Sequence, residues 1–316
     1  MRNLTIGHND SGQRLDKFLQ KATTLPPSLM HKYIRRKRIK LNQLRCQHNV
    51  ILKPGDSIEL FINDEFFVPV DAKMVFVKTT IKPEVIYEDT NIIIANKPPG
   101  QLVHEDKDEK VNTLINAIKK YLFHNGEYNP SANCFAPALC HRIDRNTSGL
   151  VLAAKNSVTL RVLNQKIKNR ELEKSYLCVV HNIPRPKEAV LTAYLWKDEA
   201  NNRAVISSVP GNGYKLIKTR YRVLRDWGRI SLLEVDLITG RTHQIRAHLA
   251  YIGCPVLGDN KYGRIKNNRI WGLKSQALCA TKLKFGFASD AGHLGYLQNR
   301  EFVLDDIWFR DQFPLF

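Results

Sequence analysis

The stretch ALCHRIDRNTSGLVLAAKN, residues 138–156, joins a charged segment to a long apolar run. Its one carboxylate, Asp144, lies between Arg142 and Arg145, and a polar Asn-Thr-Ser-Gly segment follows it. A polar turn before an apolar run predicts a buried strand that is entered through a tight turn. From the residues alone, Asp144 is either a turn-forming acid or a carboxylate that neighbouring guanidinium groups keep ionised in a cleft, where it could act as a nucleophile.

A second segment, DLITGRTHQIRAHLAYIGCPVLGDNKYG at residues 236–263, predicts a strand that ends near Thr239-Gly240 and a helix that begins near Arg241. Arg246 lies three positions before Leu249, so the two side chains are neighbours on the helix. An arginine beside an apolar helical face either extends to solvent or pairs with a buried anion. His243 and His248 lack the i,i+4 spacing of a zinc pair, so we expect both to form hydrogen bonds instead.

Two shorter segments have weaker signals. In EKSYLCVV, residues 173–180, Lys174 and Tyr176 are two apart on an expected strand and therefore share a face. A tyrosine in a strand is more often part of the core than of a site. In NKPPGQLVH, residues 96–104, two prolines and a glycine predict a stiff turn after a strand. That turn is either a simple connection or a rigid wall of a cleft.

The remainder of the chain from residue 84 alternates between strand-like and helix-like patterns. Adjacent strands without regularly alternating helices favour an α+β fold, with a mixed, mainly antiparallel sheet flanked by helices. We expect helices in VNTLINAIKKYLF, SVTLRVLNQKIKN and RTHQIRAHLAYIG. We expect strands in EVIYED, NIIIANKP, SGLVLAAKN, KSYLCVVH, KEAVLTAYLW, TRYRVLRDW and ISLLEVDLI.

The first seventy residues have a different pattern, which predicts two short helices and two short strands. The helices are expected in QRLDKFLQKAT and in LPPSLMHKYIRRKR, with Ser28 as N-cap of the second, and the strands in IKLN and DSIELFI. No acidic residue occurs from Lys17 to Gly55. A solvated face usually mixes both charges, so this segment favours contact with phosphates and salt-dependent binding. The proposed contacts are Lys32, Arg35, Arg36, Lys37, Arg38 and Lys40.

The composition favours a globular protein that binds nucleic acid. The chain has 316 residues, 43% of them hydrophobic, and 49 Lys and Arg against 30 Asp and Glu give a formal charge of +19. Such a field attracts polyanions, and no apolar helix accompanies the cations toward a lipid surface. The N-terminal residues lack the apolar core of a secretion signal, so we expect a cytoplasmic protein without membrane partners. Six cysteines without a C-x-x-C pair make a metal site or a disulfide framework improbable.

Taken together, four segments resemble the RluA-type pseudouridine synthases: NKPPGQLVH, HRIDRNTSGLVLAAKN, EKSYLCVV and LITGRTHQIRAHLAYIGCPVLGDNKYG. The second and fourth are long and specific. The resemblance spans about residues 84 to 287 and implies an isomerase that needs no metal or organic cofactor. The departures are small: Ile143 replaces the usual leucine, and Glu105 replaces a common proline, which affects the shape of that loop.

The resemblance also implies roles for individual residues. Asp144 matches the catalytic aspartate, Tyr176 the tyrosine that packs on the target base, and Arg246 the arginine that pairs with the aspartate. The implied substrate-binding residues are Arg142, Arg241, Lys174 and Ile245. A methyltransferase is disfavoured because no glycine-rich strand-to-helix loop is found, and a hydrolase because no second carboxylate is evident near Asp144. The alternative that stays open is a non-catalytic RNA-binding ribosome-assembly factor.

Residues 12–62 resemble the small RNA-binding domain named after ribosomal protein S-four, in the segments RLDKFL, SLMHKYIRRKRIKLN and LKPGDSIEL. We therefore expect an ααββ RNA-binding domain at 1–70, a linker at 71–83 and a catalytic domain at 84–316. This combination resembles the enzymes that modify large-subunit ribosomal RNA in bacteria. That RNA is the expected partner, and no obligate protein partner is evident.

Overall fold

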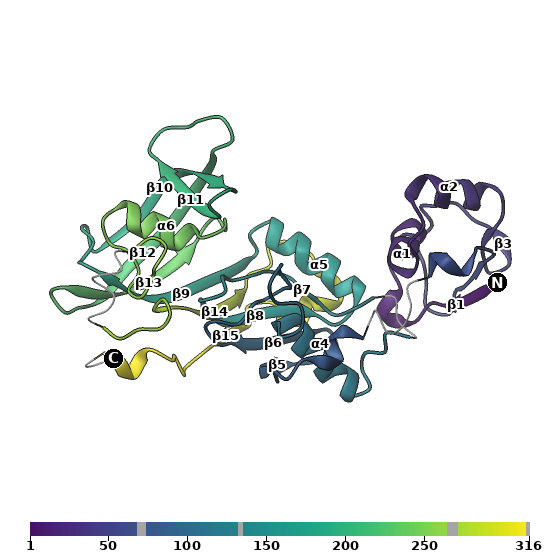
Figure 1. Ribbon diagram of the computed structural model, residues 1–316, viewed down its shortest axis with the longest axis horizontal. Helices are drawn as coiled ribbons and strands as arrows, with labels where there is room; N and C mark the ends of the chain where they lie inside the picture. The colour runs from purple at the N-terminus through teal and green to yellow at the C-terminus, as the bar shows by residue number, and fades with distance from the viewer. Residues whose placement is uncertain (68–73, 132–134, 264–270, 314–316) are drawn as a thin grey trace. The chain divides into compact units, whose positions relative to one another are not determined.

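Two helices in the N-terminal segment bury their apolar residues at helical spacing. The computed structural model describes residues 1–67, 74–131, 135–263 and 271–313 (Figure 1). α1 (Leu15–Ala22) buries Phe18, and α2 (Pro27–Arg35) buries Met30 and Ile34 in the same hydrophobic cluster. The expected N-cap at Ser28 is wrong, because α2 begins at Pro27. Proline suits the first helical position, where its missing N–H is not needed and its fixed φ is already helical.

A four-stranded antiparallel sheet completes this segment, in the order β1-β4-β2-β3. The expected strands at IKLN and DSIELFI are confirmed, and they pair with each other through Leu41 and Ile58. The strands at Arg2–Thr5 and Leu44–Arg45 were not expected. The bounds are β1 Arg2–Thr5, β2 Ile39–Leu41, β3 Leu44–Arg45 and β4 Ser57–Leu60. The expected linker, 71–83, lies partly outside the described residues, so the domain bounds remain a prediction.

The rest of the chain is organised by one eleven-stranded sheet, which is mixed but mainly antiparallel, as expected. Its order is β11-β10-β12-β13-β9-β14-β8-β6-β5, with β15 on β14 and β7 on β8. The strands are β5 Glu84–Glu88, β6 Ile92–Lys97, β7 Ala138–Leu139, β8 Ser148–Ala154, β9 Leu172–His181, β10 Glu188–Asp198, β11 Arg203–Ser207, β12 Lys215–Asp226, β13 Ile230–Leu237, β14 Leu278–Phe285 and β15 Glu301–Val303.

The described residues contain three further α-helices: α4 (Leu114–His124), α5 (Ser157–Lys168) and α6 (Gln244–Tyr251). All three were expected. α6 begins three residues later than predicted, because His243 has a left-handed φ of 55° and therefore cannot be part of the helix. Short 3-10 helices occur at His8–Asp10, Asp64–Phe66, Val75–Lys78, Gly292–Leu297 and Arg310–Gln312. No described helix is long and apolar enough to cross a membrane.

The chain forms two compact units, each made of non-contiguous segments. One unit contains residues 1–94, 102–141 and 152–165, and the other contains 95–101, 142–151 and 166–316. Asp144, Tyr176 and Arg246 all belong to the second unit, so the candidate site lies within it.

The strand that follows Asp144 is buried along its whole length, as its apolar run predicted. β8 pairs in parallel with β14, a central strand that the sequence pattern did not reveal. Gly149 has a φ of +109°, and a Cβ there would lie 2.2 Å from the backbone oxygen of Ala280. Only glycine allows the two backbones to approach this closely. The Asn-Thr-Ser-Gly segment is therefore both a turn and a contact point with β14.

Candidate active site

Asp144 lies in the turn before β8, where its carbonyl accepts a hydrogen bond from the backbone N–H of Thr147 at 3.1 Å. Its side chain is 23% exposed and points to Arg246 on α6, whose Nη1 donates to Oδ2 at 2.9 Å. The flanking arginines, Arg142 and Arg145, are exposed. The expectation that neighbouring guanidinium groups hold this carboxylate is therefore corrected, while the Arg246 contact that the resemblance implied is present. The contacting guanidinium comes from 102 positions along the chain.

Arg246 is a buried cation between two carboxylates. Besides Asp144 it contacts Asp259, with Nε donating to Oδ2 at 2.7 Å and Nη2 to Oδ1 at 2.9 Å. Burial alone would lower the pKa of Arg246, but its hydrogen bonds to Asp259 and the charges of both carboxylates raise it. Of the two alternatives for this arginine, extension to solvent is wrong and pairing with a buried anion is confirmed.

Asp259 is the residue that the sequence interpretation missed. Its side chain is fully buried, and Oδ1 also accepts from the backbone N–H groups of Lys261 at 2.8 Å and Tyr262 at 3.1 Å. Burial would raise the pKa of Asp259, but the hydrogen bonds from Arg246 lower it. A second carboxylate thus does lie near Asp144, contrary to the sequence interpretation. Its bonds to Arg246 and to two backbone N–H groups fix the carboxylate, which in turn holds the arginine beside Asp144.

Tyr176 lies on β9 and is 5% exposed. Burial raises the pKa of its phenol, and the negative charge of Asp144 raises it further. The phenol therefore stays neutral, and it lies within electrostatic reach of the carboxylate. Lys174, on the same face of β9, is half-buried and lines a groove of about 780 Å³ together with Arg241, which is exposed. Ile245, on α6, is buried.

Lys97 is a second residue beside the Asp144 turn that the sequence interpretation missed. Its fully buried ammonium donates to the carbonyls of Pro98 and Gln101 at 2.9 Å and of Arg145 at 2.8 Å. Burial lowers the pKa of Lys97 to about 7, although the charge of Asp144 opposes that shift. The backbone N–H of Gly100 also donates to the carbonyl of Arg145. The stiff proline turn is thus bonded to the Asp144 turn, which favours a rigid wall over a simple connection.

His243 and His248 both form hydrogen bonds, as expected. His243 Nδ1 lies 2.9 Å from the hydroxyl of Tyr262, and its Nε2 lies 3.9 Å from Asp144 Oδ2. His248 Nδ1 lies 3.0 Å from the hydroxyl of Thr219. Burial lowers the pKa of both imidazoles, to about 4 for His248. Both rings are therefore neutral at pH 7.

The described residues contain no cluster of three potential metal ligands, and their five cysteines are free thiols. Cys134 lies outside the described residues. The arrangement around Asp144 thus consists of one carboxylate with an arginine partner, a buried phenol and a lysine-fixed turn. It can support nucleophilic or proton-transfer chemistry by the carboxylate on a substrate that reaches its exposed side.

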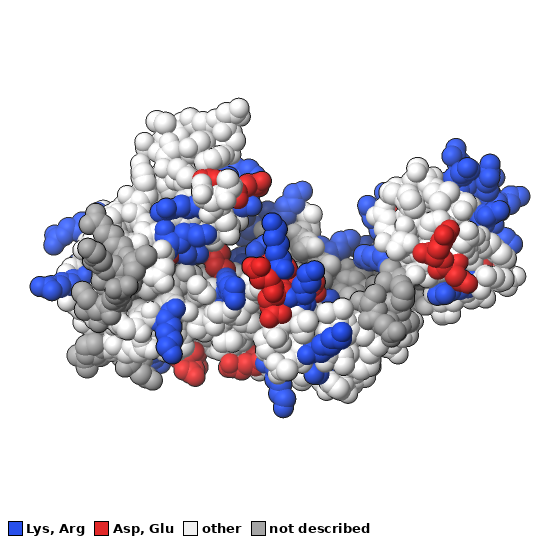
Figure 2. Space-filling model, viewed as in Figure 1, with Lys and Arg blue, Asp and Glu red and all other residues white. Residues whose placement is uncertain are grey.

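The N-terminal segment has a separate basic surface. Of its predicted RNA contacts, Lys32, Arg35, Arg36, Lys37 and Arg38 are exposed and Lys40 is half-buried. Figure 2 shows Lys and Arg side chains gathered where Figure 1 labels α2 and β3.

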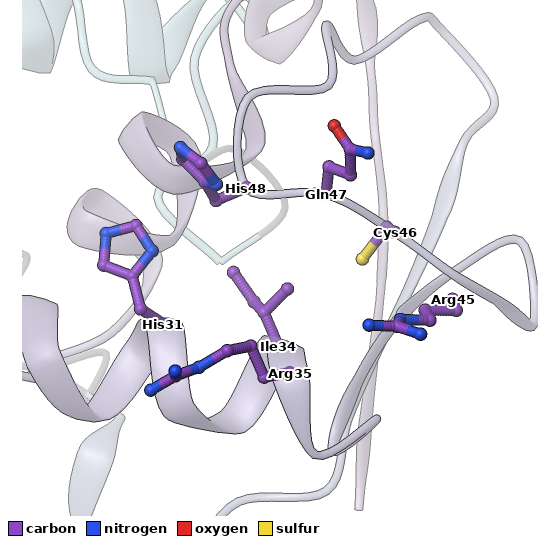
Figure 3. A pocket seen from close by; sticks show the side chains of 7 residues that line it. All are labelled: His31, Ile34, Arg35, Arg45, Cys46, Gln47 and His48. Carbon is purple, nitrogen blue, oxygen red and sulfur yellow. The ribbon is translucent and has the colours of Figure 1, made fainter.

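A pocket of about 690 Å³ opens in the same segment (Figure 3). His31 and Arg35 of α2 and Arg45 of β3 line it with His48, and the His31 and His48 rings meet edge to face at 4.8 Å. Arg45 belongs to the basic run of the sequence, whereas His31 and His48 are polar groups that the sequence interpretation did not include.

The chain is similar to one family of known proteins. The family model described as RNA pseudouridylate synthase matches residues 91–251. A ribosomal large subunit pseudouridine synthase C from Rickettsia bellii is 34% identical over 264 residues, which cover 80% of this chain and 83% of the relative. A ribosomal large subunit pseudouridine synthase D from Borreliella burgdorferi is 32% identical over 233 residues, covering 72% and 71%.

A solved structure has a similar fold. Human RNA Pseudouridylate Synthase Domain Containing 4 superimposes with a TM-score of 0.57 at 21% identity, covering 72% of this chain and 90% of that one. The sheet described above therefore corresponds to a known architecture.

Proposed function

We propose a substrate and a mechanism for this chain on one premise: it belongs to the RNA pseudouridylate synthase family. It is thus an isomerase that converts uridine in RNA to pseudouridine. The proposed substrate is large-subunit ribosomal RNA, because the names of its relatives specify that subunit. In a bacterium this reaction would take place in the cytoplasm.

Asp144 is the proposed catalytic group. The target uridine is first flipped out of its helix, as enzymes that act on a base require. Asp144 then initiates cleavage of the bond between the ribose C1′ and the base N1, either by attack on the nucleoside or by removal of a ribose proton. The uracil turns and its C5 bonds to C1′, while the bond to Asp144 breaks or Asp144 returns the ribose proton. The proton lost from C5 is balanced by one gained at N1. Atoms are conserved, so neither water nor a redox partner is consumed.

Arg246 and Tyr176 have supporting roles in this step. Arg246 keeps Asp144 charged and oriented through the 2.9 Å hydrogen bond. Tyr176 offers its neutral ring for stacking, worth about 1–3 kcal/mol for a base on an aromatic side chain. Its burial also excludes water while the free base turns. The remaining proposed contacts to the substrate are Arg142, Lys174, Arg241 and Ile245.

The observation that carries this proposal is the Asp144–Arg246 pair beside buried Tyr176. Asp144→Asn tests it, because the amide preserves shape but removes the charge. Release of tritium from ribosomal RNA labelled at uridine C5 measures turnover. We expect no detectable turnover, whereas the exposed control Asp226→Asn should behave as the unmodified chain. Turnover retained by Asp144→Asn would remove this carboxylate from the mechanism, and RNA binding by an unmodified chain that never forms pseudouridine would favour the assembly-factor alternative.

Residues 1–70 are proposed to be an RNA-binding domain of the ribosomal protein S-four type, followed by the linker 71–83 and the catalytic domain 84–316. The exposed cations of α2 and the residues after it support this. Neutralising Arg35, Arg36 and Lys37 together with glutamine should reduce the salt slope of RNA binding by about 0.7 for each lost contact with single-stranded RNA. Lys187→Gln, which is 65% exposed elsewhere, is the control. An unchanged slope in the triple variant would contradict this RNA contact.

A further inference from the structure

A cavity of about 760 Å³ lies where β10 ends and β12 begins. Its lining includes Trp196 and Lys197 of β10, Gly213 and Lys215 before and at the start of β12, and Arg241. Apart from Arg241, none of these residues has a role in the mechanism proposed above.

Trp196 gives this cavity an aromatic wall. Its side chain is 39% exposed, so part of the indole is available to a ligand. Tyr214 stacks on it, with ring centroids 6.4 Å apart and planes inclined by 29°. Gly213, at a φ of +78°, lies beside the indole, since an added Cβ would be in ordinary van der Waals contact with Trp196 Cδ1 at 3.6 Å. The indole thus packs against Tyr214 and Gly213 while part of its surface stays open.

The charges around the indole favour an anion. Lys197, Lys215 and Arg241 are cations, and two acids also line the cavity. Asp198 accepts hydrogen bonds from the backbone and side-chain nitrogens of Asn201, at 3.1 and 2.7 Å, and Glu199 pairs with Lys197 at 3.4 Å. Lys215 and Arg241 then remain as cations without an acid among these lining residues, next to an exposed aromatic ring. This combination binds single-stranded nucleic acid through stacking and phosphate contact.

One loop joins this cavity to the candidate active site. Gly240, Arg241 and Thr242 line the cavity, and the next residue, His243, approaches Asp144 to 3.9 Å. Two residues of chain span at most about 7 Å. The loop is also fixed from the other side, because Tyr262 bonds His243 and accepts from the backbone N–H of Ala204 on β11 at 2.7 Å.

We propose that this cavity binds an unpaired nucleotide next to the target uridine, with its base stacked on Trp196 and its phosphate held by Arg241 and Lys215. The assignment rests on the proposed function, since it needs an RNA strand that enters the Asp144 site. A flipped uridine leaves its neighbours unstacked, and an aromatic surface beside the site restores the stacking that they lose. The cavity thus acts in substrate binding rather than in the chemical step.

Trp196→Ala in the full chain tests this with tritium release from large-subunit ribosomal RNA. Stacking on an aromatic side chain predicts a KM raised by about 5- to 150-fold with little change in kcat. Trp196→Phe keeps an aromatic ring and should restore most of the affinity. Leu216→Ala, which removes a 45% exposed apolar side chain of β12, is the matched control and should leave both constants unchanged. An unaltered KM in Trp196→Ala overturns the proposal, as does an equal rise in Leu216→Ala.

A binding measurement separates this proposal from the proposed function. A short oligouridylate is added to the Asp144→Asn chain, and tryptophan fluorescence is compared with that of Asp144→Asn combined with Trp196→Phe. Stacking should quench a component that the second protein lacks, and an abasic oligomer of equal length should quench neither. Quenching independent of Trp196 refutes the stacking site. If quenching depends on Trp196 but the unmodified chain makes no pseudouridine, the stacking site is supported and the proposed reaction is refuted.

Discussion

Replacing Asp259 with asparagine should damage both stability and catalysis, although this residue does not touch the reacting atoms. Asp259 accepts two of the three hydrogen bonds that Arg246 gives to the carboxylates. Asparagine keeps the shape, but one of its two polar atoms becomes an N–H donor that faces a guanidinium donor. The buried cation then loses its fully buried partner and retains only Asp144.

The expected size follows from these contacts. Removing one member of a buried pair costs about 3–5 kcal/mol when the remaining charge is uncompensated, and here the partly exposed Asp144 is the one carboxylate left to Arg246. The free energy of unfolding should fall by this amount. Arg246 should also shift from its position beside Asp144, and a displacement of about 1 Å can lower a rate by about 100-fold. We therefore expect kcat to fall by roughly that factor.

Urea unfolding and tritium release measure the two effects. Asp226→Asn removes an exposed carboxylate, 33% exposed and paired with Lys187, and should cost about 1 kcal/mol or less with no change in kcat. If Asp259→Asn proves too unstable to purify, Asp259→Glu retains the charge and tests position alone. A kcat within about threefold of the unmodified chain, despite lost stability, would show that Asp259 serves the fold and not the orientation of Arg246.

Three further predictions concern the surroundings of the site. Burial holds the pKa of His248 at about 4 against 6.5 for a free side chain, so the unfolded chain binds the extra proton and the free energy of unfolding should fall by about 3 kcal/mol between pH 7 and pH 4. His248→Gln should lack this part of the pH dependence in urea unfolding, and an identical loss would contradict it. In thermal unfolding, Gly149→Ala should lower the free energy of unfolding by about 3 kcal/mol or more. Gly295→Ala, where an added Cβ meets open space, should change it little. Lys97→Met removes the donor to three carbonyls, and we expect kcat to fall at least about tenfold relative to the control Lys187→Met; equal rates would mean that the Asp144 turn needs no lysine.

The sequence by itself determined the local elements and the chemical type of the site. Helical spacing located α1, α4 and α5, and the apolar run after Asp144 identified a buried strand, because burial patterns repeat with the period of the element that forms them. The motif around Arg246 was sufficient to predict that this arginine either pairs with a buried anion or extends to solvent. The sequence also indicated a nucleic-acid partner, because a net charge of +19 depends on composition and not on folding.

Only the tertiary structure decided which groups meet. The family resemblance implied that Arg246 pairs with Asp144, whereas the residues alone pointed to the neighbours Arg142 and Arg145. The structure shows the contact across 102 positions and adds Asp259 from the loop after α6. The central strand β14 was also not predicted, although its second half alternates between buried and half-buried residues. The physical reason is common to these cases: charge pairing and burial depend on distance in space, and the local periodicity of a chain contains no record of which distant segment will lie beside it.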